Sequence, residues 1–186
     1  MRRKIEKDKI WETIWYGGDF MVKMYGIEEV IKFSTLSFIL WKKHKEKMIN
    51  DYNICKKYFE DFVVNTEAIT KKRKYIEVQK YIKWEKLQEQ HFKDKKVKIQ
   101  FRQIIKIMGQ MEKQWIENID LVWIDGILKN YFWNIIVDEN KKLHIIDASL
   151  LECKSIWMLY YIFGPFRYIA KILQKRMIQN YSIYLK

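Results

Sequence analysis

Acidic and amide side chains that could hold metal-bound phosphate lie between Trp123 and Ser149, in the sequence WIDGILKNYFWNIIVDENKKLHIIDAS. An apolar run from Ile135 to Val137 is followed by turn-forming residues and by a second apolar run, Leu143 to Ile146, which ends at Asp147. This pattern predicts a β-hairpin whose open end carries an Asp, an Asn and a second Asp. Carboxylate and amide oxygens are ligands that Mg²⁺ accepts, and Mg²⁺ usually binds together with substrate phosphates. The stretch therefore predicts a site for Mg²⁺-bound phosphate.

The same stretch resembles the catalytic loop and metal-binding strand of the protein-kinase-like superfamily, where D-x-x-x-x-N precedes a hairpin and a D-F-G-type motif. Asp125 and Asn130 have that spacing, whereas Asn134 directly precedes the apolar strand, as the family's Asn does. In this second register, Lys129 replaces the expected Asp. The resemblance implies Asp125 as the catalytic base, Asn130 or Asn134 as a metal ligand, and Asp147 as the other ligand. An ordinary polar turn at Asp125 and Asn130 is the alternative.

Composition and charge describe a folded, basic protein. The chain has 186 residues, enough for one domain or one small two-lobed unit, and 49% of them are hydrophobic. Its 36 Lys and Arg against 23 Asp and Glu give a net charge of +13. Because these basic residues are spread along the whole chain, we interpret them as general composition and expect no specific nucleic-acid surface.

Cysteine usage and the lack of a leader both indicate a reducing compartment. Cys55 and Cys153 are too few and too isolated for a disulfide framework or a zinc site. No apolar core follows the basic N-terminus, and the longest uncharged run, from Ser155 to Phe166, is too short to cross a bilayer. We therefore expect a cytoplasmic protein.

The N-terminal region carries two candidate phosphate contacts. Aromatic and β-branched residues predict strands between Trp11 and Ser34, interrupted by Gly17 and Gly18. A lysine within a strand, such as Lys32, is costly to bury unless its ammonium group meets an opposite charge. The triplet VIK resembles the V-A-I-K strand of kinases, which implies that Lys32 holds the α/β-phosphates of a nucleotide. Gly17 and Gly18 could cradle phosphates through their backbone N–H groups, or could form an ordinary hairpin turn.

A helix is predicted from Leu40 to Phe59 by apolar residues at three- and four-residue steps. It carries two acids, Glu46 and Asp51, either of which could face Lys32 as the acid of the kinase αC helix does. We favour Asp51, because it lies beside the apolar stripe. The alternative for both is an acid exposed to solvent.

Two further strands are predicted from Phe62 to Ile69 and from Lys74 to Ile82. The second strand resembles the kinase hinge. That resemblance implies that Gln79 gates the nucleotide pocket and that the backbone from Lys80 to Ile82 bonds the adenine edge. An edge strand without a ligand is the alternative.

Helical periodicity is clearest from Val97 to Trp115, where one face is apolar and the other is charged or polar. A second helical pattern runs from Phe166 to Tyr181. Its basic residues could contact an anionic membrane surface, although a solvated helix face is the alternative. These basic residues are Arg167, Lys171, Lys175 and Arg176.

Taken together, the resemblance implies an α+β, two-lobed kinase-like fold in a single domain. A small β-rich N-lobe with the hinge would occupy about residues 1–82, and a mainly helical C-lobe with the catalytic-loop hairpin about residues 83–186. The implied function is ATP- and Mg²⁺-dependent transfer of the γ-phosphate to a hydroxyl of a small molecule or glycan. The short chain after Asp147 makes it resemble small-molecule and lipopolysaccharide kinases more than Ser/Thr protein kinases.

Two alternatives remain open from the sequence. One is a catalytically inactive kinase-like (pseudokinase) binding module, because Trp123 replaces the usual His and DAS replaces D-F-G. The other is a basic nucleic-acid-binding protein with aromatic stacking residues.

Overall fold

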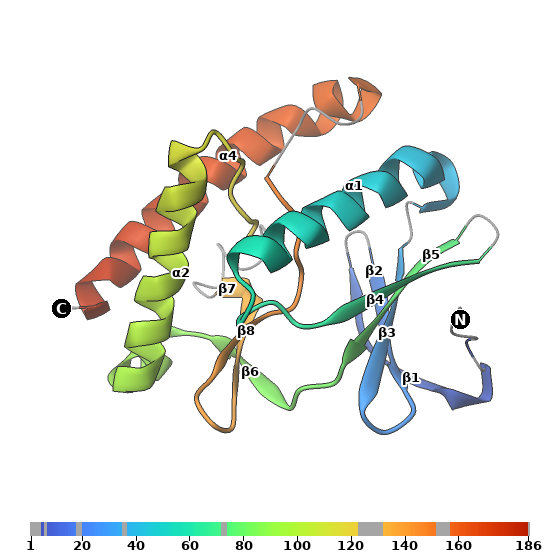
Figure 1. Ribbon diagram of the computed structural model, residues 1–186, viewed down its shortest axis with the longest axis horizontal. Coiled ribbons are helices and arrows are strands. Elements are labelled where there is room, and N and C mark those ends of the chain that lie inside the picture. The colour runs from blue at the N-terminus through green and yellow to red at the C-terminus, as the bar shows by residue number, and fades with distance from the viewer. Residues whose placement is uncertain are drawn as a thin grey trace. The chain divides into compact units, whose positions relative to one another are not determined.

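The structure is a computed structural model that describes residue 5 and residues 7–17, 20–34, 37–71, 74–122, 132–151 and 157–185. The described part contains a five-stranded sheet, a three-stranded sheet and three α-helices, which confirms the predicted α+β class (Figure 1). The strands are β1 (Ile10–Gly17), β2 (Phe20–Tyr25), β3 (Glu29–Ser34), β4 (Thr66–Lys71), β5 (Lys74–Lys80), β6 (Trp84–Leu87), β7 (Phe132–Asp138) and β8 (Leu143–Ile145). The α-helices are α1 (Ser37–Tyr58), α2 (Lys95–Lys113) and α4 (Trp157–Ser182), and short 3-10 helices span Lys7–Lys9, Glu89–Lys93 and Ile183–Leu185.

The chain divides into two compact units, each with its own core. Unit 1 consists of Met1–Asn50 and Val64–Ile82, and unit 2 consists of Asp51–Val63 and Lys83–Lys186. Helix α1 therefore contributes its first part to unit 1 and its C-terminal end to unit 2.

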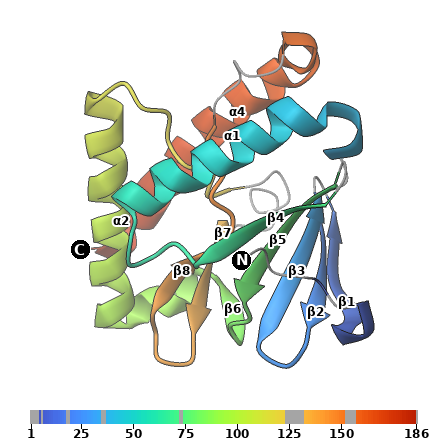
Figure 2. The same cartoon turned by 45° about the vertical axis from the view of Figure 1, so that its right-hand side comes forward.

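Unit 1 is built on an antiparallel sheet with strand order β1-β2-β3-β5-β4 (Figure 2). In the turn between β2 and β3, Gly26 has a left-handed backbone with a φ of +66°. Only glycine adopts this conformation at no steric cost. Strand β5 lies between β3 and β4, so the alternative of an edge strand is wrong.

Alternation along the strands of unit 1 gives the sheet one apolar face and one partly polar face. Ile31, Ile76 and Val78 pack with Tyr25 on the apolar face. The alternate residues of β5, which begin with Tyr75, point to the opposite face. There Tyr75 packs against Met48 of α1. That face also carries buried polar side chains, described below with the site.

In unit 2, Asp94 caps the N-terminus of helix α2. Its side chain accepts hydrogen bonds from the backbone N–H groups of Lys96 (2.7 Å) and Val97 (3.4 Å). The buried residues of α2 lie on the predicted apolar face, which confirms the helix but not its end. These residues are Val97, Phe101, Ile104, Met108 and Met111. The helix ends at Lys113, and Trp115, which was expected on the apolar face, is exposed.

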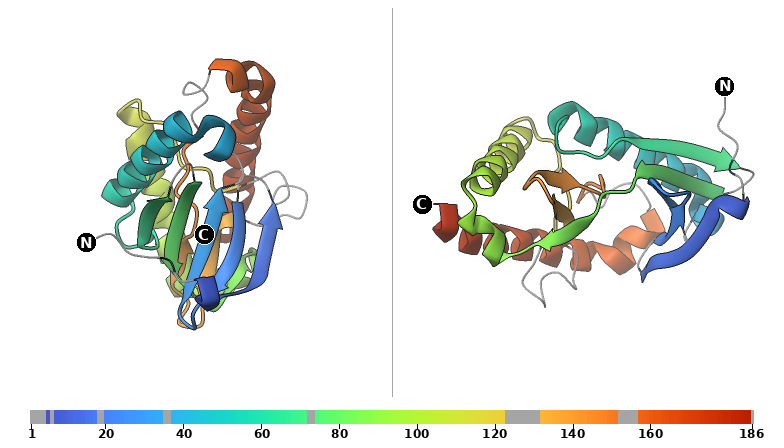
Figure 3. Two further views of the ribbon diagram at one scale, coloured as in Figure 1. Left: turned by 90° about the vertical axis from the view of Figure 1, so that its right-hand side faces the viewer. Right: turned by 90° about the horizontal axis from the view of Figure 1, so that it is seen from below.

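Aromatic side chains join the small sheet of unit 2 to its helices. The ring of Phe132 on β7 lies 5.0 Å from that of Phe101 on α2 and 5.0 Å from that of Tyr181 on α4. Strands β7 and β8 accordingly lie between α2 and α4 (Figure 3).

Burial raises the pKa of Tyr181 to about 12. Within the described residues, no helix combines the length and apolar character needed to cross a bilayer.

The predicted strand from Phe62 to Ile69 is wrong in its first half. Strand β4 begins only at Thr66, because Phe62 and Val63 pair within unit 2 instead. The carbonyl of Phe62 accepts the N–H of Ile145 (2.8 Å), and Val63 forms a parallel bridge to the same residue. Strand β6, which pairs with β7, was not predicted because its alternation is too short to read.

We predict that Gln174→Met on α4 lowers the free energy of unfolding by about 2 kcal/mol, because it removes two buried hydrogen bonds while keeping the volume. Gln174 is buried; its Oε1 accepts the N–H of Leu121 (2.7 Å) and its Nε2 donates to the carbonyl of Ile119 (2.9 Å). Urea unfolding measures the loss. The control is Gln179→Met, at an exposed position of the same helix, which should change stability by less than about 0.5 kcal/mol. Equal effects of the two substitutions would contradict the prediction.

Candidate active site

The hairpin of β7 and β8 brings two predicted metal ligands to one end of unit 2. The strands are antiparallel with Ile135 opposite Ile145. One step further, the carbonyl of Asn134 accepts the N–H of Ile146 (3.1 Å). Asp147 follows directly in the chain. Asn134 and Asp147 therefore lie at the same end of the hairpin, as the sequence pattern predicted.

Asn134 is buried and its amide is held by the segment that precedes the predicted catalytic loop. Its Nδ2 donates to the carbonyl of Asp120 (2.8 Å), and its backbone N–H donates to the carbonyl of Leu121 (3.3 Å). With the amide nitrogen directed at Asp120, Oδ1 is the side-chain atom that can ligate a cation. The arrangement fits the register in which Asn134, rather than Asn130, is the metal ligand.

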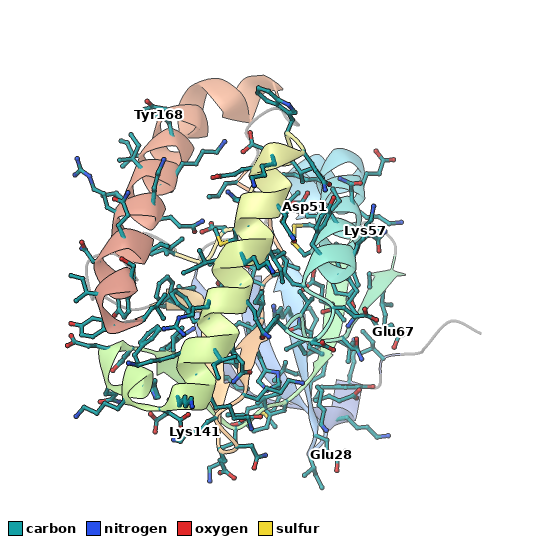
Figure 4. All side chains as sticks on the ribbon, turned by 60° about the vertical axis from the view of Figure 1, so that its left-hand side comes forward. Glu28, Asp51, Lys57, Glu67, Lys141 and Tyr168 are labelled. Atoms are coloured by element: carbon teal, nitrogen blue, oxygen red, sulfur yellow. The ribbon has the colours of Figure 1, made fainter. Side chains whose placement is uncertain are left out.

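Helix α1 bonds to the backbone that follows Asp147. The side chain of Asp147 is half-buried. The Sγ of Cys55 donates to the carbonyl of Ala148 (3.5 Å). One turn earlier on the helix, the Oδ2 of Asp51 accepts the N–H of Leu150 (3.0 Å). Asp51, which Figure 4 labels, is fully buried. The two side chains fix the path of the chain just beyond the candidate metal ligand.

The remaining residues of the predicted catalytic loop lie outside the described part of the chain. They are Trp123, Asp125, Lys129 and Asn130. The segment that leads into the loop is described and pairs with the chain after Asp147. Asp120 donates its N–H to the carbonyl of Ser149 (2.8 Å), and Leu151 donates to the carbonyl of Asn118 (2.9 Å).

The residues at the end of the hairpin fit Mg²⁺ bound through phosphate better than a closed protein cage. Among the described residues, no three His, Cys, Asp or Glu side chains gather to hold a metal ion. Asp147 supplies a carboxylate, and Asn134 supplies an amide oxygen. Mg²⁺ commonly takes one or two such protein ligands and completes its shell with phosphate oxygens and water.

In unit 1, the lysine of the VIK triplet is buried and ion-paired. Lys32 on β3 is 7% exposed, and its Nζ lies 3.8 Å from Oε2 of Glu77 on β5. The two residues are direct cross-strand partners. The hydroxyl of Tyr75, two residues before Glu77 on the same face, donates to Oε1 of Glu77 (3.0 Å). An opposite charge and a hydrogen bond thus offset much of the cost of burying Lys32 and Glu77.

The described ion pair of Lys32 is with an acid that sequence reasoning missed. Glu46, one of the two expected partners, is exposed. Asp51, the favoured partner, belongs to unit 2 and bonds Leu150 there. The missed signal was in the sequence YIEVQ: an acid at an alternate position of an apolar strand also needs a partner when it is buried.

Two residues of the hinge-like segment form hydrogen bonds within unit 1. Gln79 is buried, and its Nε2 donates to Oγ1 of Thr66 (2.6 Å). The N–H of Tyr81 donates to the carbonyl of Glu28 (2.7 Å), so Tyr81 is not the donor to an adenine edge. On either side of Tyr81, Lys80 is exposed and Ile82 is half-buried.

The paired glycines lie at a hairpin. Gly17 is the last residue of β1 and pairs with Phe20 of β2. Gly18 lies outside the described residues. Strands β1 and β2 are therefore antiparallel neighbours on either side of this position, and the phosphate cradle stays a prediction.

The far end of the β7–β8 hairpin is closed by Asp138. Its Oδ1 accepts the N–H groups of Asn140 (2.9 Å) and Lys142 (2.8 Å), and its Oδ2 lies 3.0 Å from Nε2 of His144. Burial opposes ionisation of the carboxyl, but the hydrogen bonds from His144 and from the backbone outweigh it and lower the pKa of Asp138. This turn sets the register that brings Asn134 and Asp147 together.

We predict that Asp138→Asn lowers the free energy of unfolding by about 1 kcal/mol near neutral pH, because it removes the charge that these donors stabilise. Since the folded pKa is lowered, this stabilisation is fully present above the unfolded value of 3.8 and is lost as the pH falls through the folded pKa. The difference between wild type and variant in urea unfolding should therefore shrink at acidic pH. Glu139→Gln, in the exposed pair with Lys83, is the control with little effect at any pH. A pH-independent difference for Asp138→Asn would refute the electrostatic origin.

Comparison with known proteins adds no assignment to this geometry. No model of a known protein family matches the sequence, and a search of curated proteins finds no significant match.

Proposed function

We propose that the chain is an ATP- and Mg²⁺-dependent phosphotransferase of the protein-kinase-like kind. It would transfer the γ-phosphate to a hydroxyl of a small molecule or glycan. The observation that supports this proposal most is the buried Lys32–Glu77 ion pair on the third strand of an antiparallel sheet. Protein kinases carry their phosphate-binding lysine on the third strand and pair it with a glutamate of the αC helix. Here the paired acid is Glu77 of the neighbouring strand β5.

The order of elements along the chain also supports the proposal. A strand with a lysine (β3) is followed by a helix (α1), a hinge-like strand (β5) and a long packed helix (α2). A hairpin (β7 and β8) that ends at an acid then follows. Each element alone is common, but their sequence is the one that the resemblance implies.

In the proposed reaction, unit 1 binds the nucleotide. Lys32 contacts the α- and β-phosphates, and Glu77 keeps the ammonium group in place. The ion pair supplies a lysine whose charge is already desolvated and oriented, so little reorganisation accompanies phosphate binding. The carbonyl of Lys80 and the N–H of Ile82 are the proposed contacts of the adenine edge.

Unit 2 supplies the groups for the metal and the acceptor. Asp147 and Asn134 would hold Mg²⁺, which neutralises charge on the transferred phosphoryl group when bound. Asp125 would accept the proton of the acceptor hydroxyl, whose oxygen then attacks the γ-phosphorus and displaces ADP. Positioning and charge neutralisation provide most of the rate enhancement in such reactions.

An inactive kinase-like module is the second candidate, and features of the sequence favour it. If Asn134 is the metal ligand, the family's spacing puts Lys129, not an acid, at the base position. The described bond of Asn134 to Asp120 fits that register. Asp125 can serve as the base only if the loop contains a short insertion. Mg²⁺-dependent ATP turnover that is lost in Asp125→Asn would exclude this candidate.

We predict that Mg²⁺·ATP raises the melting temperature of the wild type but not of Asp147→Ala. A ligand that binds only the folded state stabilises it by about 2.7 kcal/mol at one hundred times its Kd. Removing the carboxylate removes the protein's charged contact with Mg²⁺. Differential scanning fluorimetry with ATP, with and without Mg²⁺, measures the shift.

The matched control for this experiment is Asp61→Ala, which removes an exposed acid of unit 2 and should keep the full shift. A Mg²⁺-dependent shift of the same size in Asp147→Ala would overturn the metal assignment. No shift in the wild type at millimolar ATP would overturn the proposed function.

We also predict that Glu77→Gln weakens Mg²⁺·ATP binding by about tenfold, or about 1.4 kcal/mol, because Lys32 loses the charge that orients it. Isothermal titration calorimetry measures the Kd. Because the substitution breaks the buried Lys32–Glu77 ion pair, it should also lower the melting temperature without ligand.

A double-mutant cycle separates orientation of Lys32 from general destabilisation. In a Lys32→Met background, Glu77→Gln should have no further effect on the Kd for Mg²⁺·ATP. Glu67→Gln, at an exposed position of neighbouring β4, is the control and should bind like the wild type. An additive loss in the double variant would show that Glu77 does not act through Lys32.

A further inference from the structure

The C-terminal helix of unit 2 presents apolar side chains to solvent. On α4, Tyr168 is 66% exposed, Ile169 is 50% exposed and Ile172 is 39% exposed. Ile172 lies four residues after Tyr168 and three after Ile169, and side chains at these steps are neighbours on a helix surface, so the three form one patch. Figure 4 shows Tyr168 on the outer side of the helix. Isolated exposed apolar residues need no explanation, but a cluster of large ones does.

The same face continues with positive charge. Lys175 and Arg176 are both exposed, and at 100° per residue they fall on either side of the line through Ile172. From residue 153 to the end of the chain there is no Asp or Glu. The Lys and Arg residues of this stretch are Lys154, Arg167, Lys171, Lys175, Arg176 and Lys186. The face thus combines apolar side chains with the exposed basic side chains of Lys175 and Arg176.

An almost entirely exposed tryptophan lies in the chain segment that pairs with α4. Trp115 follows the end of α2 with a φ of +59° and is 94% exposed. Two residues later, Glu117 pairs with Lys171 of α4, which holds the chain around Trp115 beside the helix. A large aromatic ring in a left-handed backbone conformation and in full contact with water is costly in both respects.

We propose that this α4 surface, formed by Trp115, Tyr168, Ile169, Ile172, Lys175 and Arg176, binds the surface of an anionic lipid membrane. Trp and Tyr rings favour the region between headgroups and acyl chains, where an apolar body and a polar edge are both satisfied. The isoleucines enter the acyl boundary, and the basic side chains extend to anionic headgroups. The helix lies parallel to the membrane plane.

Charge alone would equally suit a nucleic acid, but the aliphatic part of the α4 surface favours lipid. A phosphate backbone attracts Lys175 and Arg176, and bases can stack on Trp115. Neither provides an apolar layer in which Ile169 and Ile172 lose their contact with water. A lipid leaflet provides that layer together with anionic headgroups, so it complements the whole surface.

The test is co-sedimentation of the full chain with vesicles of phosphatidylcholine alone or mixed with phosphatidylglycerol. We expect binding to the mixed vesicles, much weaker binding to the neutral ones, and a decrease with added salt because the Lys and Arg contacts are screened. No nucleotide is added. Vesicle binding therefore stands or falls independently of the proposed phosphotransfer.

Paired variants with matched controls locate the binding surface. Ile172→Ser and the double variant Lys175→Glu/Arg176→Glu should each weaken binding to mixed vesicles at least about tenfold. Ile99→Ser removes a similarly exposed isoleucine (44%) of α2, and Arg102→Glu/Lys106→Glu reverses two exposed charges on that helix. Both controls should bind like the wild type. Unchanged melting temperatures of all four variants would show that folding is intact.

Several outcomes would overturn the proposal. They are absence of binding to mixed vesicles, equal binding to neutral vesicles, or equal losses in the α2 controls. Wild-type binding by Ile172→Ser would show attraction by charge alone, without insertion. A monomer–dimer equilibrium in sedimentation velocity that Ile172→Ser abolishes would assign the surface to a second copy of the chain. Binding to single-stranded DNA that survives Ile172→Ser but not the charge reversal would assign it to nucleic acid.

Discussion

Buried backbone without regular secondary structure is the constraint on which unit 2 depends. Residues 118–122 and 146–151 form neither a helix nor an extended sheet, yet Ile119, Leu121 and Leu150 are buried. Since water cannot reach such backbone, its N–H and C=O groups need partners within the protein. The two segments pair with each other at a few points. Side chains from three separate elements complete the bonding: one carboxylate on α1, one amide on β7 and one amide on α4.

Because of this requirement, the buried polar residues of unit 2 stabilise the fold whether or not they take part in catalysis. Asp51, Asn134 and Gln174 each satisfy a backbone group that would otherwise be buried without a partner. One of these bonds, from the N–H of Leu150 to Asp51, fixes the chain just beyond Asp147. A metal ligand held in this way loses little freedom when a metal–phosphate complex binds, which is the condition for preorganised catalysis. Of these three residues, Asn134 is the one that also belongs to the proposed metal site.

The basic side chains of unit 1 and of the C-terminal helix discussed above differ in their burial. Lys32 is buried, and its cost is offset by Glu77 on the neighbouring strand and by the hydroxyl of Tyr75. On α4, basic and apolar side chains instead remain in water. The first arrangement suits a phosphate group that enters a prepared site, and the second suits a large surface that is both anionic and apolar. A phosphotransferase that docks on a membrane would have use for both.

The sequence by itself determined the elements whose signals are local. The apolar face from Val97 onward identified α2, and the two apolar runs around Asp138 identified the hairpin that brings Asn134 and Asp147 together. Only the tertiary structure decided which residues meet across long separations. It placed Glu77 beside Lys32, bonded Asp51 to the N–H of Leu150, and bonded the carbonyl of Phe62 to Ile145. The physical reason is that periodicity reports the face on which a side chain lies, whereas its partner depends on strand order and register, which are set by packing of the whole chain.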